Sequence, residues 1–241
     1  MFWELLRTDT TFALYMLLFA VAILMMIAGF RVRSVFNRHS KQMARSGMTA
    51  DEAARQILYE AGVTDVRIEG CRGHLTDHYD PRDNTVYLSE GVYGNRSIAS
   101  LGVAAHEVGH AIQHAEGYAP VRLRTALVPV MNIANRLMFP MILLGLIVDL
   151  MQLTTLATLF LWIGIGGYAM YTFFLLVTLP VELNASHRAL AALGDTRILA
   201  REEIPPTRRV LSAAAMTYLL SFAYSLLQLL RLIAIFGRRR D

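Results

Sequence analysis

Residues 104–117, AAHEVGHAIQHAEG, place two histidines and a glutamate at a spacing that suits metal-dependent hydrolysis. His106 and His110 are four positions apart, so on an α-helix both imidazoles lie on one face and can bind one cation. Glu107 is the next residue round the helix and can take a proton from a water molecule bound to that cation. A catalytic zinc ion is commonly held by three protein ligands and keeps a further position open for water, so a third ligand must come from elsewhere in the chain.

Residues 104–117 have other possible interpretations. A chance match would bury two imidazoles and a carboxylate without partners in an otherwise apolar helix, which costs free energy. In the longer pattern HExxHxxGxxH, the glycine and the third histidine would fall at Gln113 and Glu116, so that class is excluded. His114 is a further four positions along the helix, on the same face as His106 and His110. It lies about 12 Å along the helix axis from His106, too far for the two to share one ion. A helix cap, a surface contact or support of the ligands is its expected role.

Glu182 is the predicted third ligand. The first acidic residue after Glu116 is Asp149, which follows one long apolar segment and therefore falls about 30 Å away, across a bilayer. Glu182 follows a second apolar segment, which returns the chain to the starting face. Pro180 can begin a helix that places Glu182 in its first turn. A carboxylate that only stabilises a helix N-terminus is the alternative interpretation of Glu182.

The composition indicates an integral membrane protein. Of the 241 residues, 55% are hydrophobic and 17% are charged, whereas soluble proteins average about 25% charged residues. Four apolar segments have the length of a membrane span, at residues 11–30, 127–150, 155–179 and 210–236, and the crossing of the last one is left open. The single cysteine excludes an intramolecular disulfide bond. Without a Gly-rich phosphate loop or an aromatic-basic pattern, nucleic acid is not an expected partner.

The distribution of basic residues predicts the orientation in the membrane. Most arginines and lysines near the apolar segments fall on the side of the polar domain, with a dense group in residues 31–45. The opposite side holds Arg7 and, if the fourth segment crosses, the tail arginines 238–240. The positive-inside rule therefore places the polar domain in the cytoplasm.

Local signals between the first two apolar segments predict a small α+β domain. Thr49 and Glu52 form a capping box, which begins a helix that ends near Gly62. Ser97 can cap the helix of the metal motif, which ends near Gly117. Short strands are predicted between these helices, at residues 63–70 and 84–90, and a loop rich in His, Asp and Pro joins them.

Two long blocks, residues 73–120 and 180–190, resemble the bacterial membrane-anchored neutral zinc metallopeptidases of the YugP-like family. The likeness extends from about residue 49 to the last apolar segment, and the first span also fits. More distantly, the order of HExxH, membrane hairpin and Glu-x-x-Ala is similar to heat-shock membrane endopeptidases and CAAX prenyl proteases. In those proteins an aspartate follows the alanine, where this chain has Ser186. The resemblance implies a gluzincin, a membrane zinc endopeptidase, with Zn²⁺ on His106, His110 and Glu182 and with Glu107 as the general base.

Several residues near the metal motif are candidates for contacts with a substrate. In this resemblance the strand at residues 84–90 is an edge strand that pairs with an extended peptide, and a purely structural strand is equally consistent. The candidates for stabilising an oxyanion or binding substrate are His78, Tyr79, Asn184, His187 and Arg188. A loop held by Asx turns and a solvated helix face are the alternatives for these residues.

We therefore predict a mainly α membrane protein whose transmembrane helices carry a small α+β, zincin-like catalytic domain. The predicted parts are an N-terminal anchor (1–30), a cytoplasmic domain with the metal helix (31–126), a transmembrane hairpin (127–180), a third-ligand helix and loop (181–209), and a C-terminal apolar helix with a basic tail (210–241). The predicted function is hydrolysis of membrane or membrane-proximal proteins at the bacterial inner membrane. The alternatives are an enzyme with zinc inside the membrane and a non-catalytic zinc-binding adaptor or protease-complex partner. The sequence does not specify substrate, cleavage preference, oligomeric state or regulation.

Overall fold

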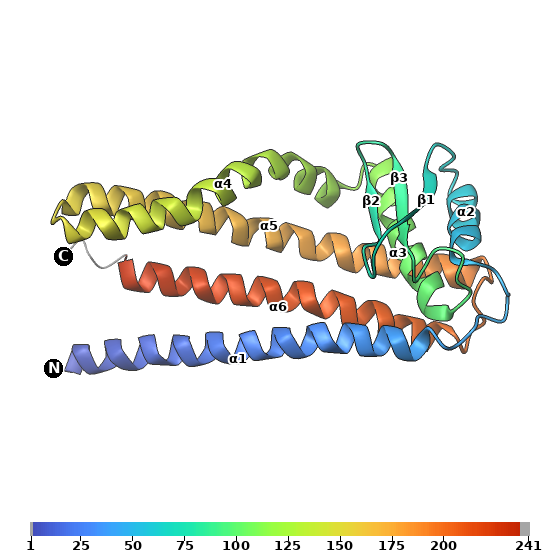
Figure 1. Cartoon of the computed structure of the whole chain (residues 1–241), viewed down its shortest axis with the longest axis horizontal. Coiled ribbons are helices and arrows are strands. Elements are labelled where there is room, and N and C mark those ends of the chain that lie inside the picture. Colours follow the sequence, from blue (N-terminus) through green and yellow to red (C-terminus); the bar gives the residue numbers. More distant parts are fainter. Residues whose placement is uncertain (1, 237–241) are drawn as a thin grey trace. The chain divides into compact units, whose positions relative to one another are not determined.

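The computed structural model describes residues 2–236, with side chains from residue 12 onward, and is dominated by helices (Figure 1). The elements are α1 (Phe2–His39), α2 (Ala50–Glu60), β1 (Arg67–Cys71), β2 (His78–Asp80), β3 (Thr85–Ser89), α3 (Ile98–Ala115), α4 (Ala119–Leu150), α5 (Thr154–Asp195) and α6 (Ile204–Phe236). Contacts divide the chain into two compact units. Among the described residues, the helical unit comprises 2–26, 123–179 and 218–236, and the mixed unit comprises 27–122 and 180–217. The chain is a mainly α membrane protein with a small α+β domain, as predicted.

The helical unit consists of apolar helices. Four helices of the described chain are long and apolar enough to cross a membrane, namely α1 from residue 12 onward, α4, α5 and α6. Glycines let α4 and α5 pack closely as a hairpin, because a Cβ atom added to Gly145 would lie 2.7 Å from Leu161 Cγ. A Cβ atom on Gly164 would lie 2.5 Å from Ile142 Cγ1, so this contact also requires glycine. Exposed large apolar side chains along these helices suit contact with lipid.

The mixed unit contains a three-stranded sheet in the order β1-β3-β2 (Figure 1). β1 pairs in parallel with β3, and β2 pairs antiparallel with the other side of β3. The expectation that residues 84–90 form an edge strand is therefore wrong, because both sides of β3 are already hydrogen-bonded. The two edge strands are β1 and β2, and β2 is a three-residue strand inside the segment that was expected to be a loop.

Caps and burial fix the two helices that support the sheet. The Thr49–Glu52 capping box begins α2 as predicted, and Gly62 follows the helix with φ of +70°. The Ser97 side chain accepts a hydrogen bond from the Ser100 amide at the start of α3, and Gly117 follows α3 with φ of +66°. α3 packs against α2, β2 and β3. The shared core comprises buried side chains of α2, β1, β3, α3 and the loop after β3, and Tyr79 of β2 packs against it partly buried. Its members include Ile57, Leu58, Ile68, Val86, Leu88, Val92, Leu101 and Val108.

The structure of α5 differs from the expectation that Pro180 begins a helix. Pro180 does not begin a new helix, because α5 is one continuous helix of 42 residues with Pro180 inside it. Glu182 is therefore not in the first turn of any helix, and the interpretation of Glu182 as a carboxylate that stabilises a helix N-terminus is wrong. The same helix contains the third apolar segment and, after Pro180, the part that belongs to the mixed unit.

A glycine allows α3 and α5 to approach closely in the mixed unit. A Cβ atom on Gly109 would lie 2.8 Å from the carbonyl oxygen of Ala185, which is shorter than real Cβ contacts. The obstacle is backbone, which cannot swing away as a flexible side chain can. Gly109 therefore sets the distance between the helix of the HExxH motif and the helix that carries Glu182.

Replacing Gly109 by alanine is expected to destabilise the protein by about 1–3 kcal/mol, because overpacking moves the two helices apart. The measurement is thermal unfolding of the full chain in detergent, together with its zinc content. The matched control is Gly166→Ala in the membrane part of α5, where an added Cβ would meet nothing within 4 Å. Helix propensity predicts that the control is neutral or stabilising. Equal melting temperatures for the two variants would show that the contact between α3 and α5 is not tight.

Candidate metal centre

Three potential ligand atoms converge where α3 packs against α5. His106 Nε2 lies 3.4 Å from Glu182 Oε2, and His110 Nε2 lies 3.5 Å from the same oxygen. The two imidazole rings are 4.8 Å apart and nearly perpendicular. One ligand atom from each residue lies within 4.8 Å of the others, so the three residues form a group that could hold one metal ion. The residues predicted from the spacing and from the returning hairpin are thus brought together.

Burial raises the free-energy cost of a charged group in this cluster. Glu182 is 2% exposed, and its neighbours on the inner face of α5, Val181 and Ala185, are fully buried. A carboxylate in such surroundings requires positive charge or hydrogen-bond donors close by. Two imidazole nitrogens and one carboxylate oxygen form a donor set that zinc prefers, so the residues present fit this ion.

The hydrogen bond of His110 determines which ring nitrogen faces the cluster. Gln113 is fully buried, and its Nε2 donates to the carbonyl oxygen of Val181 at 2.9 Å and to Asn184 Oδ1 at 2.8 Å. Because a carbonyl can only accept, the amide group of Gln113 can be oriented only in this way. Gln113 Oε1 is therefore the atom that faces His110 Nδ1, at 3.0 Å, and it accepts a hydrogen bond from Nδ1–H. This arrangement leaves the lone pair of His110 Nε2 directed at the cluster.

Ser186 has the corresponding place beside the other histidine. Its hydroxyl oxygen lies 3.1 Å from His106 Nδ1, so it can accept a hydrogen bond from Nδ1–H and leave Nε2 free to bind a cation. Ser186 stands where the distantly similar peptidases have aspartate. A neutral hydroxyl is a weaker acceptor than a carboxylate, but its distance here is that of an ordinary hydrogen bond.

The environment raises the pKa of His110. Burial by itself disfavours the charged imidazole, but the hydrogen bond to Glu182 and the charges of Glu107 and Glu182 outweigh it and raise the pKa of His110 above its usual value. A proton and a metal ion therefore compete for this imidazole. Glu107, which is 9% exposed, follows His106 on α3 and precedes His110 by less than one turn.

Two of the predicted substrate residues, Asn184 and Arg188, support His110 through Gln113. Asn184 Oδ1 accepts hydrogen bonds from Gln113 Nε2 and from Arg188 Nε, the latter at 2.8 Å. Arg188 also forms an ion pair with Glu116 at 2.7 Å, and this partner lowers the pKa of the Glu116 carboxyl. The resulting chain from Glu116 to His110 was not foreseen in the sequence. Its only signal was a glutamine placed three positions after a histidine on a buried helix face.

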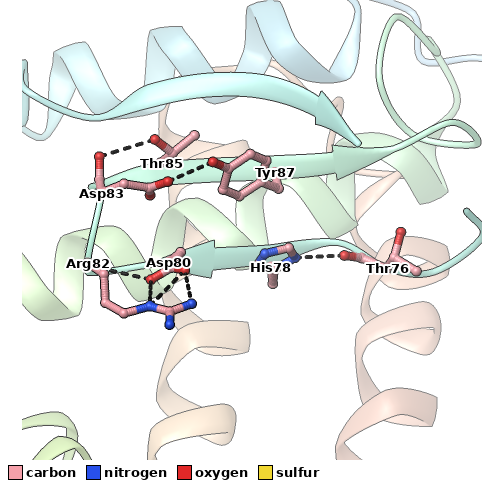
Figure 2. A network of polar contacts seen from close by, with 7 residues as sticks. All are labelled: Thr76, His78, Asp80, Arg82, Asp83, Thr85 and Tyr87. Carbon is pink, nitrogen blue, oxygen red and sulfur yellow. Dashed lines mark hydrogen bonds and ion pairs between the residues drawn. The ribbon is translucent and has the colours of Figure 1, made fainter. Parts of the chain in front are cut away.

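The other predicted substrate residues lie on β2 and on the outer side of α5. His78 stacks on Tyr87 with ring centroids 5.0 Å apart, and its Nδ1 lies 2.8 Å from the carbonyl oxygen of Thr76 (Figure 2). The Tyr79 hydroxyl donates to Asn84 Oδ1 at 2.7 Å, and its ring lies 6.0 Å from that of His114. His114 is therefore a contact between α3 and β2. His187 lines a hollow between α5 and α6 together with Ser186.

Polar contacts stabilise the turn between β2 and β3. Figure 2 shows the Arg82 guanidinium against the Asp80 carboxylate, with Nη2 2.6 Å from Oδ2. Hydrogen bonds from the Arg82 side chain and amide lower the pKa of Asp80 to about 2. On the neighbouring strand, the Tyr87 hydroxyl donates to Asp83 Oδ2 at 2.7 Å. These contacts hold β2 in place along the sheet edge.

An HExxH helix with a distant glutamate, joined by apolar helices, is the arrangement of a membrane zinc metallopeptidase. The chain belongs to the family described as "Putative neutral zinc metallopeptidase", whose family model matches residues 14–237. It is also similar to the "Putative membrane protease YugP" of Bacillus subtilis (strain 168). The two are 44% identical over 214 residues, which is 89% of this chain and 92% of that protein. No solved structure matches the chain significantly.

Proposed function

We propose that the chain is a zinc-dependent endopeptidase with His106, His110 and Glu182 as the metal ligands and Glu107 as the general base. The observation that supports this most directly is the convergence of His106 Nε2, His110 Nε2 and Glu182 Oε2. A zinc ion held by these residues would lower the pKa of a bound water molecule and polarise the scissile carbonyl. Glu107 takes the proton of the attacking water and then delivers it to the leaving amine.

The number of ligands favours catalysis over a structural role. Catalytic zinc sites commonly have three protein ligands and an open position, whereas structural sites are closed by four. In the described part of the chain, the candidate cluster has three members. A non-catalytic adaptor or protease-complex partner would instead retain the metal without hydrolysis. Substituting Glu107 separates the two functions, because zinc content and peptide hydrolysis can be measured on the same variant.

Extended peptides are the substrates that the sheet favours. β2 is one of the two edge strands of the sheet, and it packs against α3, which carries the HExxH motif. An extended peptide can therefore add to the outer side of β2 by main-chain hydrogen bonds. His78 and Tyr79 belong to this strand and remain our candidates for substrate or oxyanion contacts. Asn184 and Arg188 are assigned instead to the support of His110.

The membrane helices suggest substrates at the bilayer surface. Glu182 lies three positions after Leu179, the last residue of α5 in the helical unit, and a residue adds about 1.5 Å along a helix. Membrane proteins or segments drawn from them are therefore the proposed substrates. The excess of arginine beside the mixed unit supports a cytoplasmic orientation at the inner membrane of a bacterium.

Replacing Gln113 by leucine is expected to lower zinc affinity about tenfold to a hundredfold, which is the usual cost of removing the partner of a metal-binding histidine. Leucine cannot accept the Nδ1 proton, so His110 Nε2 is no longer held with its lone pair toward the metal. The measurement is competition with a fluorescent zinc chelator, which does not depend on peptidase activity. Gln113→Glu keeps an acceptor for Nδ1 and should retain more affinity than leucine. Equal losses in both variants would show that an acceptor for Nδ1 does not by itself hold His110 in place.

A further inference from the structure

A hollow outside the metal centre lies between the end of α1 and the loop that joins β1 to β2. Its volume is about 620 Å³. α1 contributes Arg33, Phe36 and Asn37, the loop contributes His74 and Leu75, and the end of β3 contributes Ser89. All of these residues belong to the mixed unit.

The lining of this hollow presents hydrogen-bond donors and no carboxylate. A guanidinium group offers five N–H donors, and the amide and imidazole side chains add more. Within residues 12–236, the side chains of Arg33 and His74 form no hydrogen bond or ion pair, so their donors are available to a ligand. The neighbouring acid, Asp77, is already engaged, since it accepts from the Ser89 amide at 2.7 Å and from the Ser89 hydroxyl at 2.9 Å. The complementary ligand is therefore an anion with several acceptor oxygens.

The position of the hollow along the chain indicates where such an anion comes from. Arg33 follows the apolar run of residues 11–30 by three positions, so it is placed where a membrane span meets the headgroups. Phe36 and Leu75 add apolar surface to the same lining. Leu75 is 40% exposed and has φ of +55°, a left-handed conformation that is unusual for leucine. An amphipathic ligand with a phosphate group matches both parts of this lining.

We propose that this hollow binds the phosphate headgroup of an anionic phospholipid. Arg33 and His74 hold the phosphate oxygens, and Asn37 contributes a neutral donor. Phe36 and Leu75 contact the glycerol and the first carbons of the acyl chains. Free inorganic phosphate shares the same acceptor chemistry but cannot use the apolar contacts.

The test is binding of short-chain phosphatidylglycerol to the full chain in a neutral detergent, measured by native mass spectrometry. Short-chain phosphatidylcholine and inorganic phosphate serve as comparison ligands. We expect saturable binding of phosphatidylglycerol that is tighter than binding of either comparison ligand. Arg33→Gln should weaken it about tenfold to a hundredfold, as expected for loss of a charged hydrogen-bond donor. His74→Ala should weaken it in the same direction.

Arg31→Gln is the matched control, because Arg31 lies on the same helix and does not line the hollow. It should change the affinity less than threefold, consistent with loss of a distant, screened charge. Circular dichroism melting curves verify that all three variants are folded. Equal losses for Arg31→Gln and Arg33→Gln would overturn the proposal in favour of a general basic surface. Phosphate or phosphatidylcholine binding as tightly as phosphatidylglycerol would also overturn it. The measurement uses neither zinc nor hydrolysis, so its outcome is independent of the proposed peptidase activity.

Discussion

Glu107→Gln is expected to lower kcat for hydrolysis of a casein-type or membrane substrate by about 10³-fold, the middle of the range for loss of general acid–base catalysis. Glutamine is nearly isosteric with glutamate but cannot accept a proton from water at neutral pH. Glu107 is not one of the three converging ligand residues, so zinc content should stay near that of the unmodified chain. The measurements are steady-state hydrolysis and zinc content by atomic absorption, made on the same preparation.

Glu90→Gln provides the control for this substitution, since Glu90 is an exposed carboxylate that follows β3 in the same unit. It should leave both hydrolysis and zinc content unchanged. Full activity in Glu107→Gln would exclude Glu107 as the general base. Loss of zinc in the same variant would instead place Glu107 among the ligands. Either result contradicts the assignment of roles made from the geometry.

Glu182→Ala is expected to have its largest effect on metal binding. One of three protein ligands is removed, and if each supplies about a third of roughly 10 kcal/mol, affinity falls by more than about 100-fold. The two histidines remain on one face of α3 and should retain weak binding. The measurement is zinc competition against a chelator, with hydrolysis at saturating zinc as a second readout.

Asp195→Asn is the matched control for Glu182→Ala, because Asp195 is an exposed carboxyl residue at the end of the same helix. It should bind zinc as the unmodified chain does. Comparable zinc affinity in Glu182→Ala would show that a residue other than Glu182 is the third ligand. That finding would overturn the proposed site while leaving the proposed roles of His106 and His110 open to the same assay.

Local signals made much of the fold predictable. The Thr49–Glu52 capping box and the Ser97 cap each depend on a few neighbouring residues, and both helices begin where these signals place them. Long apolar runs likewise identify the four helices that can cross a membrane. The geometry at Glu182 could be anticipated because a hairpin of two membrane helices returns the chain to the same face. These inferences need only periodicity, capping chemistry and the thickness of a bilayer.

The features that were missed depend on distant parts of the chain. β2 has only three residues, and its pairing with β3 makes β3 a central strand, which no local pattern reveals. Pro180 suggested a helix start, but proline is tolerated within membrane helices, and α5 continues through it. Gln113 faces Val181 and Asn184 on another helix, so its role follows only from the packing of α3 against α5.

The order of the proposed ligands along the chain determines when, during synthesis, all three of them are present. Synthesis of α3 supplies both histidines, but the third donor is reached only after α4 and most of α5 have been made. A ribosome-bound chain that ends before α5 therefore has the two imidazoles without the carboxylate. If the three residues hold the metal as proposed, proteolytic competence arises only once the hairpin has entered the bilayer. On this proposal, the nascent chain would not be an active protease before it is anchored.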